Sequence, residues 1–311
     1  MVFRRTVLAA AGSGRLRSAA EGSGATRALA GRFIAGETLD DAVRTVRALA
    51  AAGLSATVDH LGEDVDHPAR AGAVARAYGV LLERLGEEGL TGTAEVSVKP
   101  TAVGLGLGGE GEALAEENIA RICAAAEEAG TTATLDMEAE WTVAPTLRIA
   151  DRLRARHPGL GIVLQSRLRR TEDDVRRYAA LPGARVRLVK GAYAPSPDAA
   201  HRTRGAVDAA YVRCLHTLMA GPARPLVATH DPRLIAIART LALRHGRAPG
   251  DHEFQMVYGA RPAEQERLAG LGERVRVYVP YGREWYGYLL RRLAERPAYA
   301  AFAARSLLTR S

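Results

Sequence analysis

The amino-acid sequence predicts an α/β protein built as a (βα)8 TIM-like barrel with extra N-terminal helices. Two observations carry this prediction. From about residue 55 onward, short runs of β-strand composition alternate with stretches whose apolar residues recur at helical spacing. Polar residues interrupt these runs near their C-terminal ends, where a barrel of this type builds its active site. Eight strand–helix units in succession fit a closed parallel barrel better than an open sheet.

The residues before the first strand are predicted to be helical. We assign 1–54 to a helical segment packed on the barrel, and 55–311 to the barrel as the catalytic domain. Residues 38–53 form a helix of the first segment, because Thr38 is a favourable N-cap and Gly53 a favourable stop. The opening residues resemble a signal peptide only weakly, since their short apolar stretch leads into arginine and glycine.

The barrel strands follow in order along the chain. They are SATVDH (55–60), AEVSVKP (94–100), TATLDME (132–138), GIVLQS (161–166), RVRLVKG (185–191), RPLVATH (224–230), HEFQMVYG (252–259) and VRVYVPYG (275–282). Helical stretches with glycine stops lie between them, such as 111–130 and 172–183. Polar side chains near the strand ends are expected to converge on one rim: Lys99, Asp136, Glu138, Gln165, Lys190, Thr229, His230, Gln255 and Tyr278.

Composition restricts the class of function. The 311 residues are 47% apolar and 25% charged, as in a globular protein. The formal net charge is +8, but the arginines are scattered and not clustered with aromatic residues, so we expect no nucleic-acid partner. No apolar run reaches eighteen residues, so we expect no transmembrane helix. Cys123 and Cys214 lie in helix-like segments and indicate a reducing compartment, the cytoplasm. No dense His/Asp/Glu cluster predicts a metal.

Lysine is nearly absent from the chain. Lys99 and Lys190 are its only two lysines, and each ends an apolar run. A solvated cation could have become arginine, so a lysine that persists indicates a need for a compact ammonium group. The sequence therefore points to both lysines as functional residues.

The last predicted helix, 284–298, carries an unusual face. Tyr288, Arg291, Arg292 and Glu295 are spaced i, i+3, i+4 and i+7, so they share one side. Two adjacent arginines can hold a small anion such as a carboxylate. Pro297 predicts that the helix ends just before it.

Eight motifs along this barrel together resemble the proline dehydrogenases, both the monofunctional bacterial type and the related domain of proline utilization A. In chain order they are SVKP, LDME, LQS, VRLVKGAY, ATHD, FQMVYG, VYVPYG and YLLRRLAE, and the likeness covers roughly residues 35–300. It implies FAD-dependent oxidation of L-proline to 1-pyrroline-5-carboxylate, the first step of proline catabolism to glutamate. It also implies hydride transfer from C5 of proline to flavin N5, and reoxidation by a membrane quinone. A basic protein could also contact the inner face of the cell membrane peripherally.

The resemblance implies a role for each matching position. The residues implied in catalysis are Lys99, Asp136, Tyr278, Arg291 and Arg292. Those implied in substrate binding are Lys99, Leu188, Tyr193, Tyr278, Tyr288, Arg291 and Arg292. Those implied in FAD binding are Gln165, Arg187, Lys190, Gly191, Arg204, Thr229, His230, Asp231, Gln255 and Glu295. Arg187 is expected to stabilise the anionic reduced flavin.

The chain departs from the family pattern at three places. Asp231 stands where asparagine is usual after the histidine, and a carboxylate there would repel a flavin phosphate. Ser166 and Arg167 follow Gln165 where a tyrosine is common. An aromatic residue that often follows the KGAY motif is missing.

Three alternatives stay open at the level of sequence. GLGLGG (104–109) formally matches a dinucleotide-binding fingerprint, with Asp136 closing the next strand. Lys99 or Lys190 could form a Schiff base in an aldolase-like barrel. A flavin-free barrel could serve only as a binding or scaffold protein.

Overall fold

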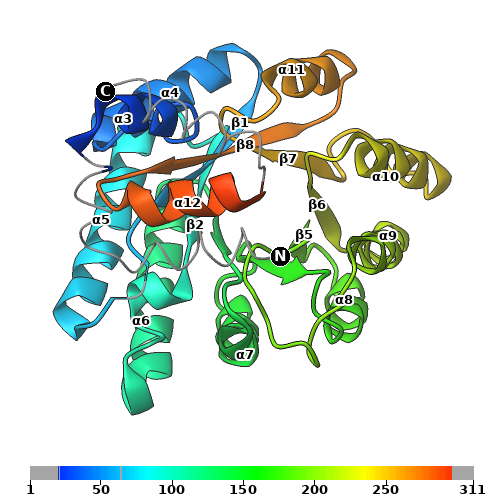
Figure 1. The fold of residues 1–311 in the computed structure, drawn as a ribbon, viewed down its shortest axis with the longest axis horizontal. Coiled ribbons are helices and arrows are strands. Elements are labelled where there is room, and N and C mark those ends of the chain that lie inside the picture. Colours follow the sequence, from blue (N-terminus) through cyan, green and yellow to red (C-terminus); the bar gives the residue numbers. More distant parts are fainter. Residues whose placement is uncertain (1–19, 21, 64, 296–311) are drawn as a thin grey trace, which may run out of the picture.

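Eight parallel strands form a closed barrel in the computed structural model, which describes residues 20, 22–63 and 65–295 (Figure 1). The strands are β1 (Ser55–His60), β2 (Ala94–Val98), β3 (Ala133–Leu135), β4 (Gly161–Gln165), β5 (Arg185–Val189), β6 (Arg224–Ala228), β7 (Glu253–Val257) and β8 (Val275–Tyr281). Each strand pairs with the next in the sequence, and β8 pairs with β1 to close the ring. The predicted barrel is confirmed, and the closed sheet rules out the doubly wound dinucleotide-binding fold.

Helices surround the barrel (Figure 1). They are α3 (Gly24–Ala30), α4 (Leu39–Ala51), α5 (Pro68–Glu87), α6 (Gly111–Glu128), α7 (Val143–Arg154), α8 (Thr171–Ala179), α9 (Arg204–Ala220), α10 (Pro232–Arg244), α11 (Pro262–Gly270) and α12 (Trp285–Glu295). Three 3-10 turns, η1 (Pro100–Val103), η2 (Gly108–Glu110) and η3 (Glu140–Thr142), lie in loops that follow β2 and β3. The predicted last helix is therefore present, whereas Pro297 lies outside the described residues.

The extra N-terminal helices are present as predicted. The side chain of Thr38 caps α4 and forms a capping box with Asp41, and Gly53 follows the helix with a left-handed φ of 73°. Helix α4 contacts β1 and β8. Helix α3 packs against α12 through a separate apolar cluster that includes Leu29, Phe33 and Trp285. The division of the chain at residue 54 stays a prediction.

Side chains on each strand alternate between the barrel interior and the surrounding helices. Apolar residues such as Val58, Val96 and Leu135 form the main core together with helix residues. The interior side chains are instead largely polar and buried: Thr57, Glu95, Ser97, Thr134, Arg187, Glu253, Gln255 and Arg276. Barrels of this type usually fill their interior with branched aliphatic residues, so this polar interior indicates a functional requirement.

The first strand has its predicted bounds, 55–60, whereas the other strands end earlier than the sequence suggests. β2 ends at Val98, just before Lys99, and β3 ends at Leu135, just before Asp136. Asp136 still donates its backbone N–H to the carbonyl oxygen of Val98 at 2.9 Å, so both residues lie just at the rim, where their side chains meet residues of other strands.

Candidate active site

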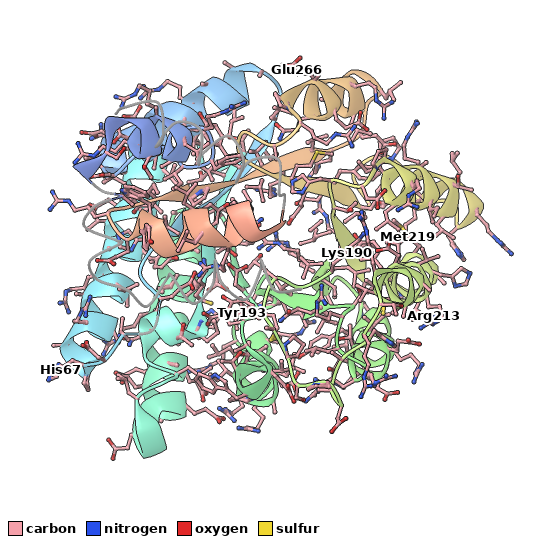
Figure 2. The ribbon with its side chains drawn as sticks, in the orientation of Figure 1. His67, Lys190, Tyr193, Arg213, Met219 and Glu266 are labelled. Atoms are coloured by element: carbon pink, nitrogen blue, oxygen red, sulfur yellow. The ribbon has the colours of Figure 1, made fainter. Side chains whose placement is uncertain are left out.

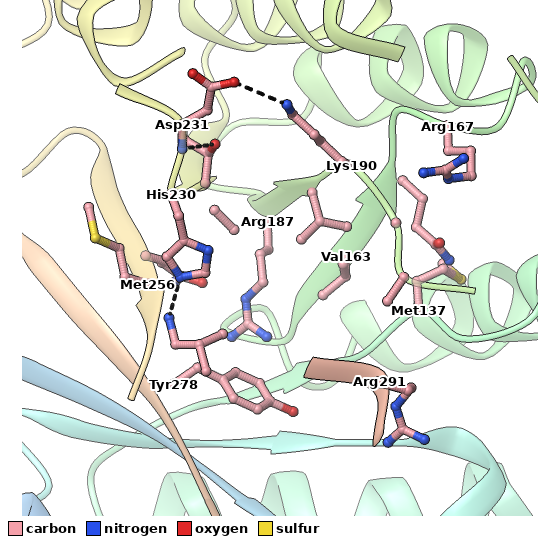
Figure 3. A pocket seen from close by; sticks show the side chains of 18 of the residues that line it. Met137, Val163, Arg167, Arg187, Lys190, His230, Asp231, Met256, Tyr278 and Arg291 are labelled. Atoms are coloured by element: carbon pink, nitrogen blue, oxygen red, sulfur yellow. Dashed lines mark hydrogen bonds and ion pairs between the residues drawn. The ribbon is translucent and has the colours of Figure 1, made fainter. Parts of the chain in front are cut away.

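A cavity of about 950 Å³ opens at the C-terminal ends of the strands and is covered by residues of α12 (Figure 3). Lys190 and Tyr193 lie inside the ring of helices (Figure 2). Most of the predicted site residues line this one cavity: Lys99, Asp136, Gln165, Arg187, Lys190, Gly191, Tyr193, Arg204, Thr229, His230, Asp231, Gln255, Tyr278, Tyr288, Arg291 and Arg292. The convergence of polar strand ends on one rim is therefore observed.

Lys99 lies at the centre of a buried group of carboxylates. Its Nζ is 2.5 Å from Asp59 Oδ2, 3.5 Å from Asp136 Oδ2 and 3.8 Å from Glu63 Oε1. Burial alone would lower the pKa of Lys99, but these three carboxylates raise it above its usual value. Lys99 therefore stays protonated, which is unfavourable for a Schiff-base nucleophile because attack on a carbonyl requires a neutral amine.

Tyr278 and Asp136 form a polar wall beside Lys99. The Tyr278 hydroxyl donates to Asp136 Oδ2 at 2.6 Å and lies 3.1 Å from Lys99 Nζ. Burial would raise the pKa of Asp136, but Lys99 and Arg187, with hydrogen bonds from Tyr278 and Ser97, lower it. Asp136 is therefore a carboxylate that holds two cations in place.

Arg187 reaches the cavity from inside the barrel and is 3% exposed. Its Nη1 donates to Ser97 Oγ and to Asp136 Oδ1, both at 2.9 Å. Its Nε and Nη2 have no hydrogen-bond partner among the described residues. Nη2 instead lies 3.6 Å from Glu95 Oε1 in an ion pair, so two carboxylates, Glu95 and Asp136, hold this cation beside the cavity.

The two arginines of α12 complete the cover of the cavity. Arg291 forms an ion pair with Glu63 in the loop after β1. Burial would lower the pKa of Arg291, but Glu63 raises it. The guanidinium of Arg292 stacks over the ring of Tyr288 at 5.2 Å. Lys99, Arg291 and Arg292 thus face one space from two sides, as the sequence predicts (Figure 3 shows Arg291 across the cavity from Arg187).

Glu138 lies behind the cavity wall and accepts hydrogen bonds from the backbone N–H of Thr101 at 2.9 Å and from its hydroxyl at 2.6 Å. Burial, helped by the nearby charge of Glu63, raises the pKa of Glu138 to about 8. Gln165 donates to the Glu138 carbonyl oxygen at 2.7 Å, which fixes the Gln165 side chain against the wall.

A second charged group lies at the far end of the cavity. Lys190 Nζ is 2.5 Å from Asp208 Oδ1 and 3.4 Å from Asp231 Oδ2 (Figure 3 shows the contact with Asp231). Asp231 Oδ1 also caps α10 by accepting from the backbone N–H of Arg233, whose side chain pairs with the same carboxylate. These contacts, the hydrogen bond from Arg233 above all, lower the pKa of Asp231 to about 2. Asp231 is thus a paired carboxylate.

His230 and Gly191 shape the wall between the two charged groups. His230 Nε2 accepts from the backbone N–H of Val257 at 2.9 Å, so this nitrogen carries no proton. Gly191 has a φ of 103°, and a Cβ there would lie 2.6 Å from Gln165 Oε1. Only glycine fits at this position, which brings the backbone close to the cavity.

Two predicted residues are not placed at the cavity. Leu188 is buried in the core between barrel and helices and does not line the cavity, so its assignment as a substrate contact is wrong in this geometry. The reason is strand alternation: Arg187 and Val189 face inward, so Leu188 faces outward. Glu295 is the last residue of α12, and its side chain lies outside the described residues.

The sequence analysis missed several acidic partners of the predicted cations. They are Asp59, Glu63 and Asp208. Asp59 is the penultimate residue of the first predicted strand and follows an apolar run, the same signal that identified Lys99. Arg167 also lines the cavity, at a position noted only as a departure from the family pattern.

Neither a metal nor a membrane span is indicated in the part of the chain that the structure describes. No group of three or more His, Cys, Asp or Glu side chains is placed to hold a metal ion among residues 20, 22–63 and 65–295. Within the same ranges, every helix is too short or too polar to cross a bilayer.

Sequence comparisons with known proteins identify the family of this chain. A family model described as "Proline dehydrogenase" matches residues 42–305. "Proline dehydrogenase 1" of Bacillus subtilis (strain 168) is 38% identical over 283 residues, 91% of this chain and 92% of that protein. "Proline dehydrogenase" of Deinococcus radiodurans is 39% identical over 286 residues, 90% of each chain.

A solved structure shows the same fold. Proline utilization A from Bdellovibrio bacteriovorus, described as inactivated by N-propargylglycine, aligns with a TM-score of 0.79 and 26% identity over 87% of this chain. The aligned part is 33% of that longer protein. The chain therefore belongs to the proline dehydrogenase family, oxidoreductases that act on the CH–NH group of proline.

Proposed function

We propose that this chain oxidises L-proline to 1-pyrroline-5-carboxylate with FAD as its cofactor, in the first step of proline catabolism to glutamate. The observation that carries the proposal is the convergence of Lys99, Arg291 and Arg292 on one cavity beside Arg187. Three cations suit the carboxylate of an amino acid, because charge-assisted hydrogen bonds to a carboxylate are strong and directional.

The substrate end of the cavity fits a small cyclic amino acid. Lys99 and Arg291 are held by acidic side chains, so they are placed before substrate arrives. Tyr278 and Tyr288 supply aromatic walls of the cavity. Tyr288 is buried and Tyr278 is half-buried. A substrate fixed by its carboxylate would hold its ring in one orientation, which hydride transfer requires more than it requires a strong acid or base.

The remainder of the cavity fits FAD. Arg187 lines the cavity, and its positive charge suits the polar edge of an isoalloxazine. Gly191 lines the cavity and has no side chain, because a Cβ there would clash with Gln165. The cofactor could therefore lie close to the backbone at this position. Lys190, Arg204 and Arg233 supply positive charge for a diphosphate. When bound, the flavin would accept at N5 the hydride released from C5 of proline.

The carboxylate at position 231 is compatible with this cofactor. The concern raised by the sequence is repulsion between Asp231 and a phosphate. Lys190 and Arg233 both pair with Asp231 and with Asp208, so these two cations and two carboxylates balance. Arg204, which also lines the cavity, then supplies the positive charge toward a diphosphate.

The electron acceptor and location follow from the same proposal. We expect a membrane quinone to reoxidise the flavin, with the protein in the cytoplasm and in peripheral contact with the inner face of the cell membrane. The formal charge of +8 favours contact with anionic lipids. Vesicles of anionic and of zwitterionic lipid, each loaded with quinone, would compare docking and turnover directly.

The decisive experiment is optical. The purified protein is expected to show an oxidised flavin spectrum that bleaches when L-proline is added without oxygen. A colourless protein, or a yellow one that proline does not bleach, would contradict the proposal. D-proline serves as the control for configuration, and L-valine serves as the control for the ring.

A further inference from the structure

The barrel interior beneath the cavity holds a carboxylate that the proposed chemistry does not use. Glu95 lies on β2 and is 2% exposed. It shares the inner side of the strand with Ser97, and Lys99 follows two residues later at the rim. Burying a charge is costly unless it is paired, so its presence here needs a reason.

Glu95 is held in the ionised form from all sides. Its oxygens accept hydrogen bonds between 2.8 and 3.4 Å from three hydroxyl groups, those of Thr57, Thr132 and Thr134. It also forms an ion pair with Arg185 and lies 3.8 Å from Arg276 Nε. Burial would raise the pKa of Glu95, but Arg185, Arg276 and Arg187 lower it well below its usual value.

Arg187 connects this buried charge to the cavity. Its Nη2 lies 3.6 Å from Glu95 Oε1, while its Nη1 donates to Asp136 and Ser97 nearer the rim. The guanidinium is therefore fixed between one carboxylate below and another at the cavity. Its Nε has no hydrogen-bond partner among the described residues.

We propose that Glu95 is a positioning residue for the flavin, which fixes Arg187 from beneath the cavity and lowers the reduction potential of the bound cofactor. The inference rests on the proposed function. A fixed negative charge in a dry interior disfavours the addition of electrons nearby, because little solvent screens it. Glu95 also partly neutralises Arg187, the cation that favours reduced flavin.

The test measures the midpoint potential of the bound flavin by anaerobic dye-linked titration. Glu95→Gln removes one negative charge but keeps an oxygen that accepts from Thr57. We expect reduction to become about tenfold more favourable, which is a shift of about +30 mV for a two-electron couple. Arg185→Gln removes one positive charge from the same cluster and should shift the potential in the negative direction.

The opposite signs separate an electrostatic role from a structural one. A general loosening of the barrel would move both variants in the same direction or release flavin from both. Potentials that match the parent in both flavin-loaded variants, or shifts of equal sign, would overturn the inference. If Glu95→Gln does not fold, Arg185→Gln alone decides, since an unchanged or raised potential refutes it. A parent protein without flavin would instead refute the proposed function.

Discussion

The ion pair between Lys99 and Asp59 is deeply buried at the substrate end of the cavity, and its loss has a calculable effect. The side chains are 8% and 0% exposed, and the N–O distance is 2.5 Å. Lys99→Met removes the cation and leaves Asp59 with only a 3.5 Å contact from the Tyr78 hydroxyl, among hydrogen bonds in the described structure. Breaking a buried pair by removing one partner costs about 3–5 kcal/mol, so we expect that loss in the free energy of unfolding at pH 8.

The pH dependence tests the cause of this loss. In the parent, the pKa of Lys99 is raised, so Lys99 is charged and its stabilising contribution is complete at pH 5 and pH 8, which both lie below its unfolded pKa of about 10. Burial raises the pKa of Asp59 even in the parent, where Lys99 opposes the shift, and the variant removes this opposition. A carboxyl with a raised folded pKa destabilises the fold as pH rises above about 4, its unfolded value. The variant should therefore lose less at pH 5 than at pH 8.

The assay is urea unfolding followed by far-UV circular dichroism at both pH values. The double variant Lys99→Met/Asp59→Asn removes both charges and should be more stable at pH 8 than Lys99→Met alone. Equal losses at pH 5 and pH 8, or a double variant whose loss is the sum of the single losses, would refute the assignment of the cost to an unpaired carboxylate.

Three further predictions concern single side chains. Arg292→Ala should raise the KM for proline roughly thirtyfold and retain flavin, because it removes a charge-assisted bond that contributes about 2 kcal/mol. Steady-state kinetics would measure this change, with Arg283→Ala as a control at an exposed position. An unchanged KM would contradict the prediction. Asp231→Asn keeps the α10 cap but removes a negative charge beside Lys190, so the variant should bind FAD with a Kd several-fold lower than that of the parent. Fluorescence titration of each apoprotein with FAD would measure this Kd. An equal or higher Kd in the variant would count against the placement of the diphosphate. Burial raises the pKa of Glu138 from 4.5 to about 8, so the parent should lose thermal stability as pH rises between these two values and level off above pH 8. Glu138→Gln should flatten this slope between pH 5 and pH 8, and parallel melting curves would refute the assignment.

Much of the fold could be predicted because its signals are local. Each strand is a short apolar run, and each run ends in polar residues that the rim requires. The same polar residues explain the errors in strand length, since Lys99 and Asp136 continue a β-like pattern beyond the last strand residues, Val98 and Leu135. Local composition cannot distinguish a strand from the extended segment that follows it.

The site was predicted less completely because partners are set by three-dimensional contact. A search for cations that bind a carboxylate finds Lys99 and Arg291 but not the acids that hold them, Asp59 and Glu63. Asp208 lies within α9 and not next to a strand end in the sequence, so the pattern of polar residues at strand ends could not identify it. The misplacement of Leu188 was avoidable, because an inward Arg187 already requires an outward neighbour.

The scarcity of lysine has a physical explanation in the two sites. Lys99 Nζ lies within 4 Å of Asp59, Asp136 and Glu63, and Lys190 Nζ lies within 4 Å of Asp208 and Asp231. A compact ammonium group can face carboxylates that converge from several directions, whereas the planar fork of arginine favours one carboxylate in its plane. Arg148 shows that second pattern in its two-pronged contact with Glu112. Arg187 also meets two carboxylates, but through different nitrogens, Nη2 toward Glu95 and Nη1 toward Asp136. Both lysines therefore lie where several acids meet at one atom.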